Sequence, residues 1–196
     1  MDWDSRTGRL IERGAIVVAS LALSVGSIAL LSGYFAGNDT AGVTGGSDGP
    51  GTVFKDLGDA YLPPNRLQPP YNSDPPTSGA HVPEAVTRDD RPLDDNQLLQ
   101  ALSLGNVVIM YGGKAPPPGL SALAVQLGGT FTPALAATGQ AVILAPRPGT
   151  SGLIALAWTR MLRVGSPSDP LLRAFIDFWL GKGAPQAASR RTLPAS

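Results

Sequence analysis

The longest apolar stretch of the chain lies close to its start. Residues 14–35 read GAIVVASLALSVGSIALLSGYF and contain no charged side chain. At 1.5 Å per residue, a helix of this length measures about 33 Å, which matches the ~30 Å hydrocarbon core of a bilayer. The pattern therefore predicts a single transmembrane helix over residues 14–35.

Charged residues on either side of this span predict its orientation. Arg6, Arg9 and Arg13 precede the span, whereas the next basic residue after it is Lys55. By the positive-inside rule, residues 1–13 are expected in the cytoplasm. The rest of the chain is then expected on the outer face of the inner (cytoplasmic) membrane, in the periplasm or an equivalent extracytoplasmic space.

A cleaved signal peptide fits the apolar span less well than a retained anchor does. Such a peptide usually has an apolar core of about 7 to 15 residues and a small-x-small cleavage site. Here the core is longer, and Tyr34-Phe35-Ala36 does not resemble such a site. A buried soluble helix is disfavoured by the length of the span. A lipoprotein anchor is excluded because the chain has no cysteine.

The pattern after the span divides the chain further. Residues 36–51 are a predicted linker because glycine and small polar residues dominate them. Residues 52–187 are the predicted outer domain, followed by a tail at 188–196. Within the domain, residues 62–84 carry so many prolines that no regular helix or strand is expected. This proline-rich arm either packs as an extended segment or continues the linker.

Regular elements are predicted after the arm from hydrophobic periodicity and capping signals. They are a helix from Asp94 or Asp95 to Leu104, a strand over Val107–Tyr111, a helix over Leu120–Leu127, a strand over Ala141–Ala145, its antiparallel partner over Leu153–Leu162, and a helix from Pro170 to just before Gly181. This order predicts an α+β fold in which helices pack on a small mixed sheet. With Thr52–Phe54 as a first strand, it is also the order of thioredoxin-like folds.

The last predicted helix has more apolar side chains than one buried stripe needs. Its first residue, Pro170, follows the capping pair Ser168-Asp169. Part of its apolar surface is therefore expected to contact a partner protein or the membrane surface. Phe175, Phe178 and Trp179 are the predicted contact residues.

Composition excludes several kinds of chemistry. Acidic and basic side chains balance at 15 each, so the chain lacks the positive charge that nucleic-acid binding requires. Without cysteine there are no disulfides, thiol nucleophiles or thiolate metal sites. His81 is the only histidine, so one copy cannot build a multi-histidine metal site. No catalytic residue and no cofactor is predicted.

His81 is a weak candidate for a metal ligand. It could be a residual ligand completed by Asp89, Asp90 or a residue of a partner. It could instead make a structural hydrogen bond in a packed loop. The structural role is favoured because zinc usually takes at least three protein ligands, and copper sites favour sulfur or further imidazoles.

Two acidic pairs and one serine are further candidates for chemistry. The pairs Asp89-Asp90 and Asp94-Asp95 could act as acid/base carboxylates or bind calcium, but they lack the EF-hand spacing. Helix capping and solvation account for them better. Ser78 precedes His81 by three residues, but no nucleophile-elbow pattern surrounds it.

The segment from Tyr71 to His81 reads YNSDPPTSGAH. It resembles the signature Tyr-Asn-Ser-x-Pro-Pro-Thr-Ser-Gly-x-His of a bacterial, often membrane-anchored family catalogued as Domain of Unknown Function 3105. Similar segments follow in the same order at Gly105–Tyr111, Ala145–Gly149, Ala155–Arg160, Arg173–Asp177 and Gly181–Gly183. The resemblance covers most of the outer domain and implies that the proline-rich arm is ordered.

The sequence departs from this family in one helix. Where the family carries His-x-Leu-Glu-His-Gly, this chain has Gln100-Ala101-Leu102-Ser103-Leu104-Gly105. The resemblance implies that the family's two helix histidines and the histidine of the arm form a metal or acid/base cluster, since positions four apart share a helix face. With Gln100, Ser103 and Leu104 in their place, this cluster is expected to be lost.

These observations lead to a functional hypothesis. The protein is expected to be a non-catalytic accessory or scaffold subunit, held in the lipid bilayer by one helix. Its outer domain is expected to dock on a larger membrane protein complex, such as a respiratory or photosynthetic one. The alternative is a metal-handling or redox accessory protein in which His81 and ligands from a partner complete a site.

Overall fold

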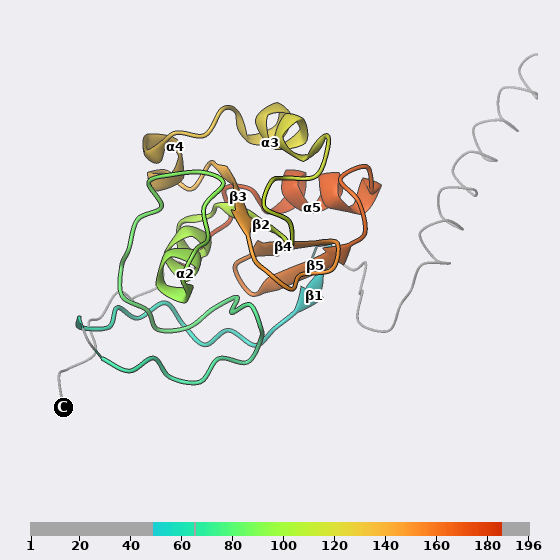
Figure 1. Cartoon of the computed structure of the whole chain (residues 1–196). Coiled ribbons are helices and arrows are strands. Elements are labelled where there is room, and N and C mark those ends of the chain that lie inside the picture. The colour runs from blue at the N-terminus through green and yellow to red at the C-terminus, as the bar shows by residue number, and fades with distance from the viewer. Residues whose placement is uncertain (1–48, 65, 186–196) are drawn as a thin grey trace, which may run out of the picture. The chain divides into compact units, whose positions relative to one another are not determined.

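The computed structural model of the chain describes residues 49–64 and 66–185 (Figure 1). The predicted transmembrane span at residues 14–35, the N-terminal segment 1–13 and the tail 188–196 lie outside the described residues. Within the described part of the chain, no helix combines the length and hydrophobicity that a membrane crossing requires.

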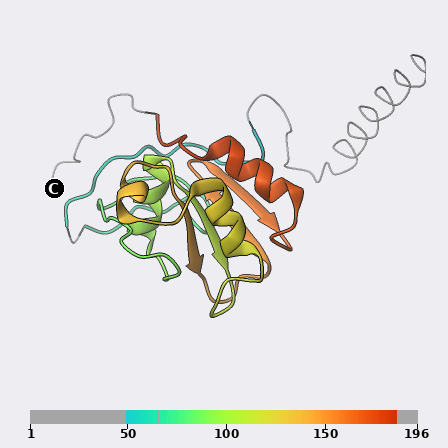
Figure 2. The same cartoon turned by 90° about the horizontal axis from the view of Figure 1, so that it is seen from above.

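A five-stranded mixed sheet with helices on both faces forms the domain (Figures 1 and 2). In chain order the elements are β1 (Thr52–Val53), α2 (Asp95–Leu104), β2 (Val107–Tyr111), α3 (Leu120–Gly128), α4 (Pro133–Ala137), β3 (Val142–Pro146), β4 (Leu153–Ala157), β5 (Arg160–Val164) and α5 (Pro170–Trp179). The predicted α+β class is confirmed.

The strands lie in the order β1-β5-β4-β2-β3. β2 and β3 are parallel, with Val107 opposite Val142, and α3 and α4 lie in the connection between them. A parallel pair needs such a long crossover connection. β4 is antiparallel to both β2 and β5, and β1 pairs antiparallel with β5 at the far edge.

One strand prediction was wrong in two respects. The segment Leu153–Leu162 is divided into β4 and β5 by a turn at Trp158 and Thr159, where Thr159 has φ of 60°. In addition, β4 pairs with β2 and not with the predicted partner Ala141–Ala145. A continuous apolar run shows neither where a strand turns nor which neighbour it pairs with.

Two hydrophobic clusters fill the space between the sheet and the helices. Alternate residues of β2 point to opposite faces of the sheet, as the pleat requires. Val107, Ile109 and Tyr111 join the cluster beneath α3 and α5, whereas Val108 and Met110 join the cluster beneath α2 and α4. The domain therefore has three layers, with α2 and the proline-rich arm on one side of the sheet and α5 on the other (Figure 2).

Capping residues set the helix boundaries. Asp94 accepts a hydrogen bond from the Gln97 amide at the start of α2, and Gly105 ends this helix with φ of 114°. The sequence predicted a helix from Asp94 or Asp95 to Leu104, and the structure places the cap at Asp94. The short helix α4 was missed, although Thr132 and Pro133 are a capping residue and a first-turn proline.

A buried asparagine, Asn106, joins α2, α4 and the residue that precedes β3. The Nδ2 atom of Asn106 donates to the carbonyls of Ala101, at 3.0 Å, and Ala136, at 2.8 Å. Its Oδ1 atom accepts from the Ala141 amide at 2.9 Å. The side chain is 1% exposed, so these hydrogen bonds replace the water that it lost on folding.

The same junction is closed by tight backbone contacts. Gly139 has φ of 74°, and a Cβ atom there would lie 1.9 Å from the Leu104 carbonyl oxygen. After α5, the chain returns to α2, where the Gly181 amide donates to the Gly105 carbonyl and the Ala184 amide to the Ser103 carbonyl. These bonds satisfy carbonyls that the end of a helix leaves unpaired. They give the Gly181–Gly183 segment a structural role.

Candidate functional site

The arm segment from Tyr71 to His81 and helix α2 form the candidate site. Polar groups of this segment are engaged in internal hydrogen bonds. Tyr71 Oη donates to the Ala80 carbonyl, Asn72 Nδ2 to the Lys55 carbonyl, the Leu57 amide to Ser78 Oγ, and the Thr159 amide to the Thr77 carbonyl. Ser78 is fully buried, and its hydroxyl also donates to the Lys55 carbonyl. The motif therefore fastens the arm to the domain.

His81 lies at the centre of this site and is 0% exposed. Its Nδ1 atom is 2.9 Å from the Gly79 carbonyl oxygen, and its Nε2 atom is 3.2 Å from Oε1 of Gln100. Because a carbonyl only accepts, Nδ1 carries a proton and donates it. The Gln100 amide faces Nε2 and can present either its oxygen or its NH₂ group to the ring. Both ring nitrogens are thus engaged inside the domain.

One of the three helix positions that differ from the family, Gln100, lies beside His81. Gln100 contacts the imidazole directly, and Leu104, one turn later, lines the same small cavity of about 60 Å³ as Gln100. Ser103 donates its hydroxyl proton to the Gln100 carbonyl. Among the described residues, no group of three His, Cys, Asp or Glu side chains is placed to hold a metal ion.

The first acidic pair, Asp89 and Asp90, bonds to β3 at the edge of the sheet. Asp89 Oδ1 accepts a hydrogen bond from the Leu144 amide at 2.8 Å, and the Asp90 amide donates to the Leu144 carbonyl at 3.0 Å. Leu144 belongs to β3, which pairs with β2 on its other side. Tyr111 Oη donates to Asp90 Oδ1. At Leu144 the pair supplies the acceptor and the donor that a neighbouring strand would otherwise provide.

Burial governs the protonation of these groups. It raises the pKa of Asp89, and the nearby Asp90 carboxylate adds to the rise, although the hydrogen bond from the Leu144 amide opposes it. Burial, together with Asp90, also raises the pKa of Tyr111 to about 12. Because burial disfavours the charged form, the ionised Asp89 carboxylate lowers the free energy of unfolding relative to the protonated form.

This cost leads to an expected pH dependence. Between the ordinary pKa of an aspartate and the raised pKa of Asp89, the folded domain binds a proton that the unfolded chain does not bind. The contribution of Asp89 to stability is therefore largest at acid pH and is lost as the pH rises through the raised pKa. Asp89→Asn should remove this contribution, as chemical unfolding between pH 4 and 7 would reveal.

Asp89→Ala provides the control for this experiment. It removes the charge and also the acceptor for the Leu144 amide, which Asp89→Asn keeps. Asp89→Ala should therefore be less stable than Asp89→Asn at every pH. Parallel pH profiles for wild type and Asp89→Asn would contradict the expectation.

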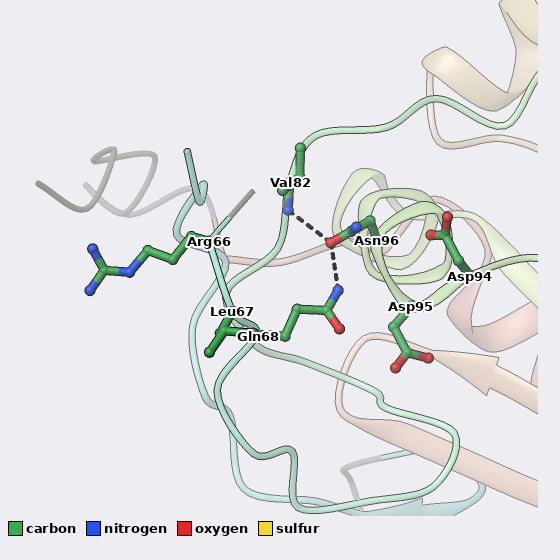
Figure 3. Close-up of a pocket in the computed structure, with 7 residues that line it drawn as sticks. All are labelled: Arg66, Leu67, Gln68, Val82, Asp94, Asp95 and Asn96. Carbon is green, nitrogen blue, oxygen red and sulfur yellow. Dashed lines mark hydrogen bonds between the residues drawn. The ribbon is translucent and has the colours of Figure 1, made fainter. Parts of the chain in front are cut away.

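A wider, open hollow of about 600 Å³ lies beside the start of α2 (Figure 3). Its lining residues are Arg66, Leu67, Gln68, Val82, Asp94, Asp95 and Asn96. Asn96 Oδ1 accepts from both Gln68 Nε2 and the Val82 amide, which ties the arm to the helix. In Figure 3, the Arg66 side chain points away from Asp94 and Asp95. The polar groups of this hollow do not converge on one point.

The second acidic pair has separate roles. Asp94 caps α2. Burial raises the pKa of Asp95; the Asp74 and Asp94 carboxylates add to the rise, and the Arg147 guanidinium opposes it. Arg147 forms an ion pair with Asp74.

The predicted contact residues of α5 are placed differently from one another. Phe175 is 0% exposed and packs in the cluster beneath α3 and α5, so its ring belongs to the core of the domain. Phe178 and Trp179 are half-buried at the C-terminal end of the helix. Of the predicted set, these two side chains reach the surface.

Comparison with known proteins identifies a family for this chain but no individual relative. A family model described as "Protein of unknown function (DUF3105)" matches residues 67–192. This confirms the resemblance drawn from the Tyr71–His81 motif. No curated protein and no solved structure matches the chain.

Proposed function

This chain belongs to the DUF3105 family of proteins of unknown function, and from this premise we propose that it is a non-catalytic accessory or scaffold subunit. Residues 14–35 anchor it in the inner membrane, and its outer domain docks on a larger membrane protein complex. A respiratory or photosynthetic assembly is a suitable host. In this proposal the domain acts through its surface.

The observation that carries the proposal is the environment of His81. Its two ring nitrogens face the Gly79 carbonyl and the Gln100 side chain in the interior of the domain. A group that transfers protons or binds a metal needs a ring nitrogen that its substrate or ion can reach. Here Nδ1 bonds within the arm and Nε2 bonds the arm to α2, which supports a structural role for the motif.

We further propose that the sheet is a variant of the thioredoxin-like arrangement. The order of elements from β2 to α5 supports this, although β1 is a short strand at the edge next to β5. The chain has no cysteine, so dithiol chemistry is not available to it. This agrees with a scaffold that works without reaction chemistry.

The alternative, a metal-handling or redox accessory protein, requires a partner's ligand to join His81. Such a ligand would have to displace Gln100 from Nε2 at a position that is 0% exposed. The imidazole geometry therefore supports the scaffold hypothesis over this alternative.

Purification from native membranes in mild detergent tests the proposal. We expect the protein to migrate with other subunits at a fixed ratio, and metal analysis to give the same low content for wild type and His81→Ala. Circular dichroism would check that the variant is folded. A monodisperse protein without companions would contradict the scaffold function. A stoichiometric metal lost in His81→Ala would favour the alternative.

A further inference from the structure

Aromatic and basic side chains gather at the C-terminal end of α5. The rings of Phe178 and Trp179 meet edge to face, with centroids 4.7 Å apart. Lys182 Nζ lies 3.5 Å from the Phe178 ring centroid, and Arg160 Cζ lies 4.8 Å from the Trp179 ring centroid. We call these four residues the aromatic–cation patch.

The patch lies where the described domain begins. Trp179 Nε1 donates to the Pro50 carbonyl at 2.8 Å. Gly49 passes so close that a Cβ atom on it would lie 2.2 Å from Cε1 of Phe178. The chain therefore joins the domain directly at the patch.

The length of chain before Gly49 limits how far the patch can be from a membrane. Thirteen residues, 36–48, separate the predicted transmembrane span from Gly49. Even fully extended, they reach no more than about 45 Å. This limit is close to the width of a domain of this size, which is about 35–40 Å. With residues 14–35 as the anchor, the patch therefore lies within about 45 Å of the bilayer.

The chemistry of the patch suits the headgroup region of a bilayer. Tryptophan and phenylalanine bury apolar rings there, while lysine and arginine keep their charges among the phosphates. Lys182 is exposed, and Arg160 is half-buried. Among the described residues, the acidic side chain next to the patch in sequence is Asp177, which is also exposed, so the two cations leave a net positive charge that favours anionic lipid.

We propose that the aromatic–cation patch rests on the headgroups of an anionic lipid surface. The proposal rests on the membrane attachment in the proposed function and assigns Phe178 and Trp179 to lipid. Docking of a protein partner then uses another surface of the domain. In this arrangement α5 holds the domain in a fixed orientation on the bilayer.

The absence of cysteine from the chain makes a direct test possible, since one introduced cysteine can be labelled uniquely. Ala174 is exposed on α5, one turn before Phe178 and on the same helix face. Ala134 is exposed on α4, at the other side of the domain in Figure 1. Full-length Ala174→Cys and Ala134→Cys would carry a spin label in vesicles with or without phosphatidylglycerol.

The expected result is a several-fold loss of collisions with a water-soluble nickel chelate at position 174 in phosphatidylglycerol vesicles. Position 134 should stay accessible. Lys182→Glu in the Ala174→Cys background should restore access at position 174, while the protein still floats with the vesicles. Circular dichroism would confirm that each variant is folded.

The outcomes separate this proposal from the function on which it rests. If the protein does not float with vesicles, the membrane attachment fails and the patch proposal falls with it. If it floats but positions 174 and 134 are equally accessible, the patch proposal alone is overturned. Protection at position 174 that appears only in native membranes would assign the patch to a protein partner and would also overturn it.

Discussion

Replacing Asn106 by alanine is expected to lower the free energy of unfolding by about 3 kcal/mol, among the largest single-residue effects in the domain. The Ala141 amide would lose its acceptor in the interior, and the carbonyls of Ala101 and Ala136 would each lose a donor. An unsatisfied buried group costs about 1–3 kcal/mol. Urea unfolding of the full chain in detergent would measure the change.

Two further variants test the role of Asn106. Asn106→Asp keeps an acceptor for Ala141 but turns a carboxylate oxygen toward the carbonyls of Ala101 and Ala136, so it should be at least as destabilising as Asn106→Ala. Asn72 is exposed and makes one hydrogen bond through its side chain, to the Lys55 carbonyl. Asn72→Ala should cost less than about 1 kcal/mol. Similar losses for Asn72→Ala and Asn106→Ala would refute the central role of Asn106.

Gly139→Ala is expected to cost about 3 kcal/mol or more, through two effects that add. An L-residue at φ of 74° is strained by about 1–2 kcal/mol. The new Cβ atom would also lie 1.9 Å from the Leu104 carbonyl oxygen, so the end of α2 and the turn after α4 would have to separate. Overpacking of this kind costs about a further 1–3 kcal/mol. Thermal and urea unfolding would both register the loss.

Gly149 is the matched control for Gly139. It has φ of 85°, but no atom lies within 4 Å of the position that a Cβ would take. Gly149→Ala should therefore show the backbone strain without the collision, at a cost of about 1–2 kcal/mol. Equal losses at the two glycines would mean that the contact between Gly139 and Leu104 contributes nothing.

Local signals in the sequence predicted most of the elements. Asp94 and Gly105 marked the two ends of α2, and the β-branched run Val107–Tyr111 coincides with β2. The pairing of the strands could not be predicted from these local signals. β4 carries apolar residues at every position, so its pattern does not distinguish β2 from β3 as its neighbour.

The site was predictable in part. The difference between Gln100 and the family motif pointed to the neighbourhood of His81, and the structure brings the two side chains within 3.2 Å. The role of Asp89 was not predictable, because its partner Leu144 lies 55 residues away. Asn106 follows a helix-ending glycine, where the sequence suggests an ordinary turn residue. Its burial depends on α4, a helix that hydrophobic periodicity did not predict.

The hydrogen bonds that Asp89 and Asp90 make to the edge of β3 affect how copies of the protein can contact one another. Proteins confined to a membrane meet one another in two dimensions, where an open strand edge would invite copies to stack into a continuous ribbon. At Leu144 both backbone groups are already bonded within the same molecule, the amide to the Asp89 carboxylate and the carbonyl to the Asp90 amide. With the chain anchored as proposed, neighbouring copies would collide at this edge without pairing their strands at Leu144.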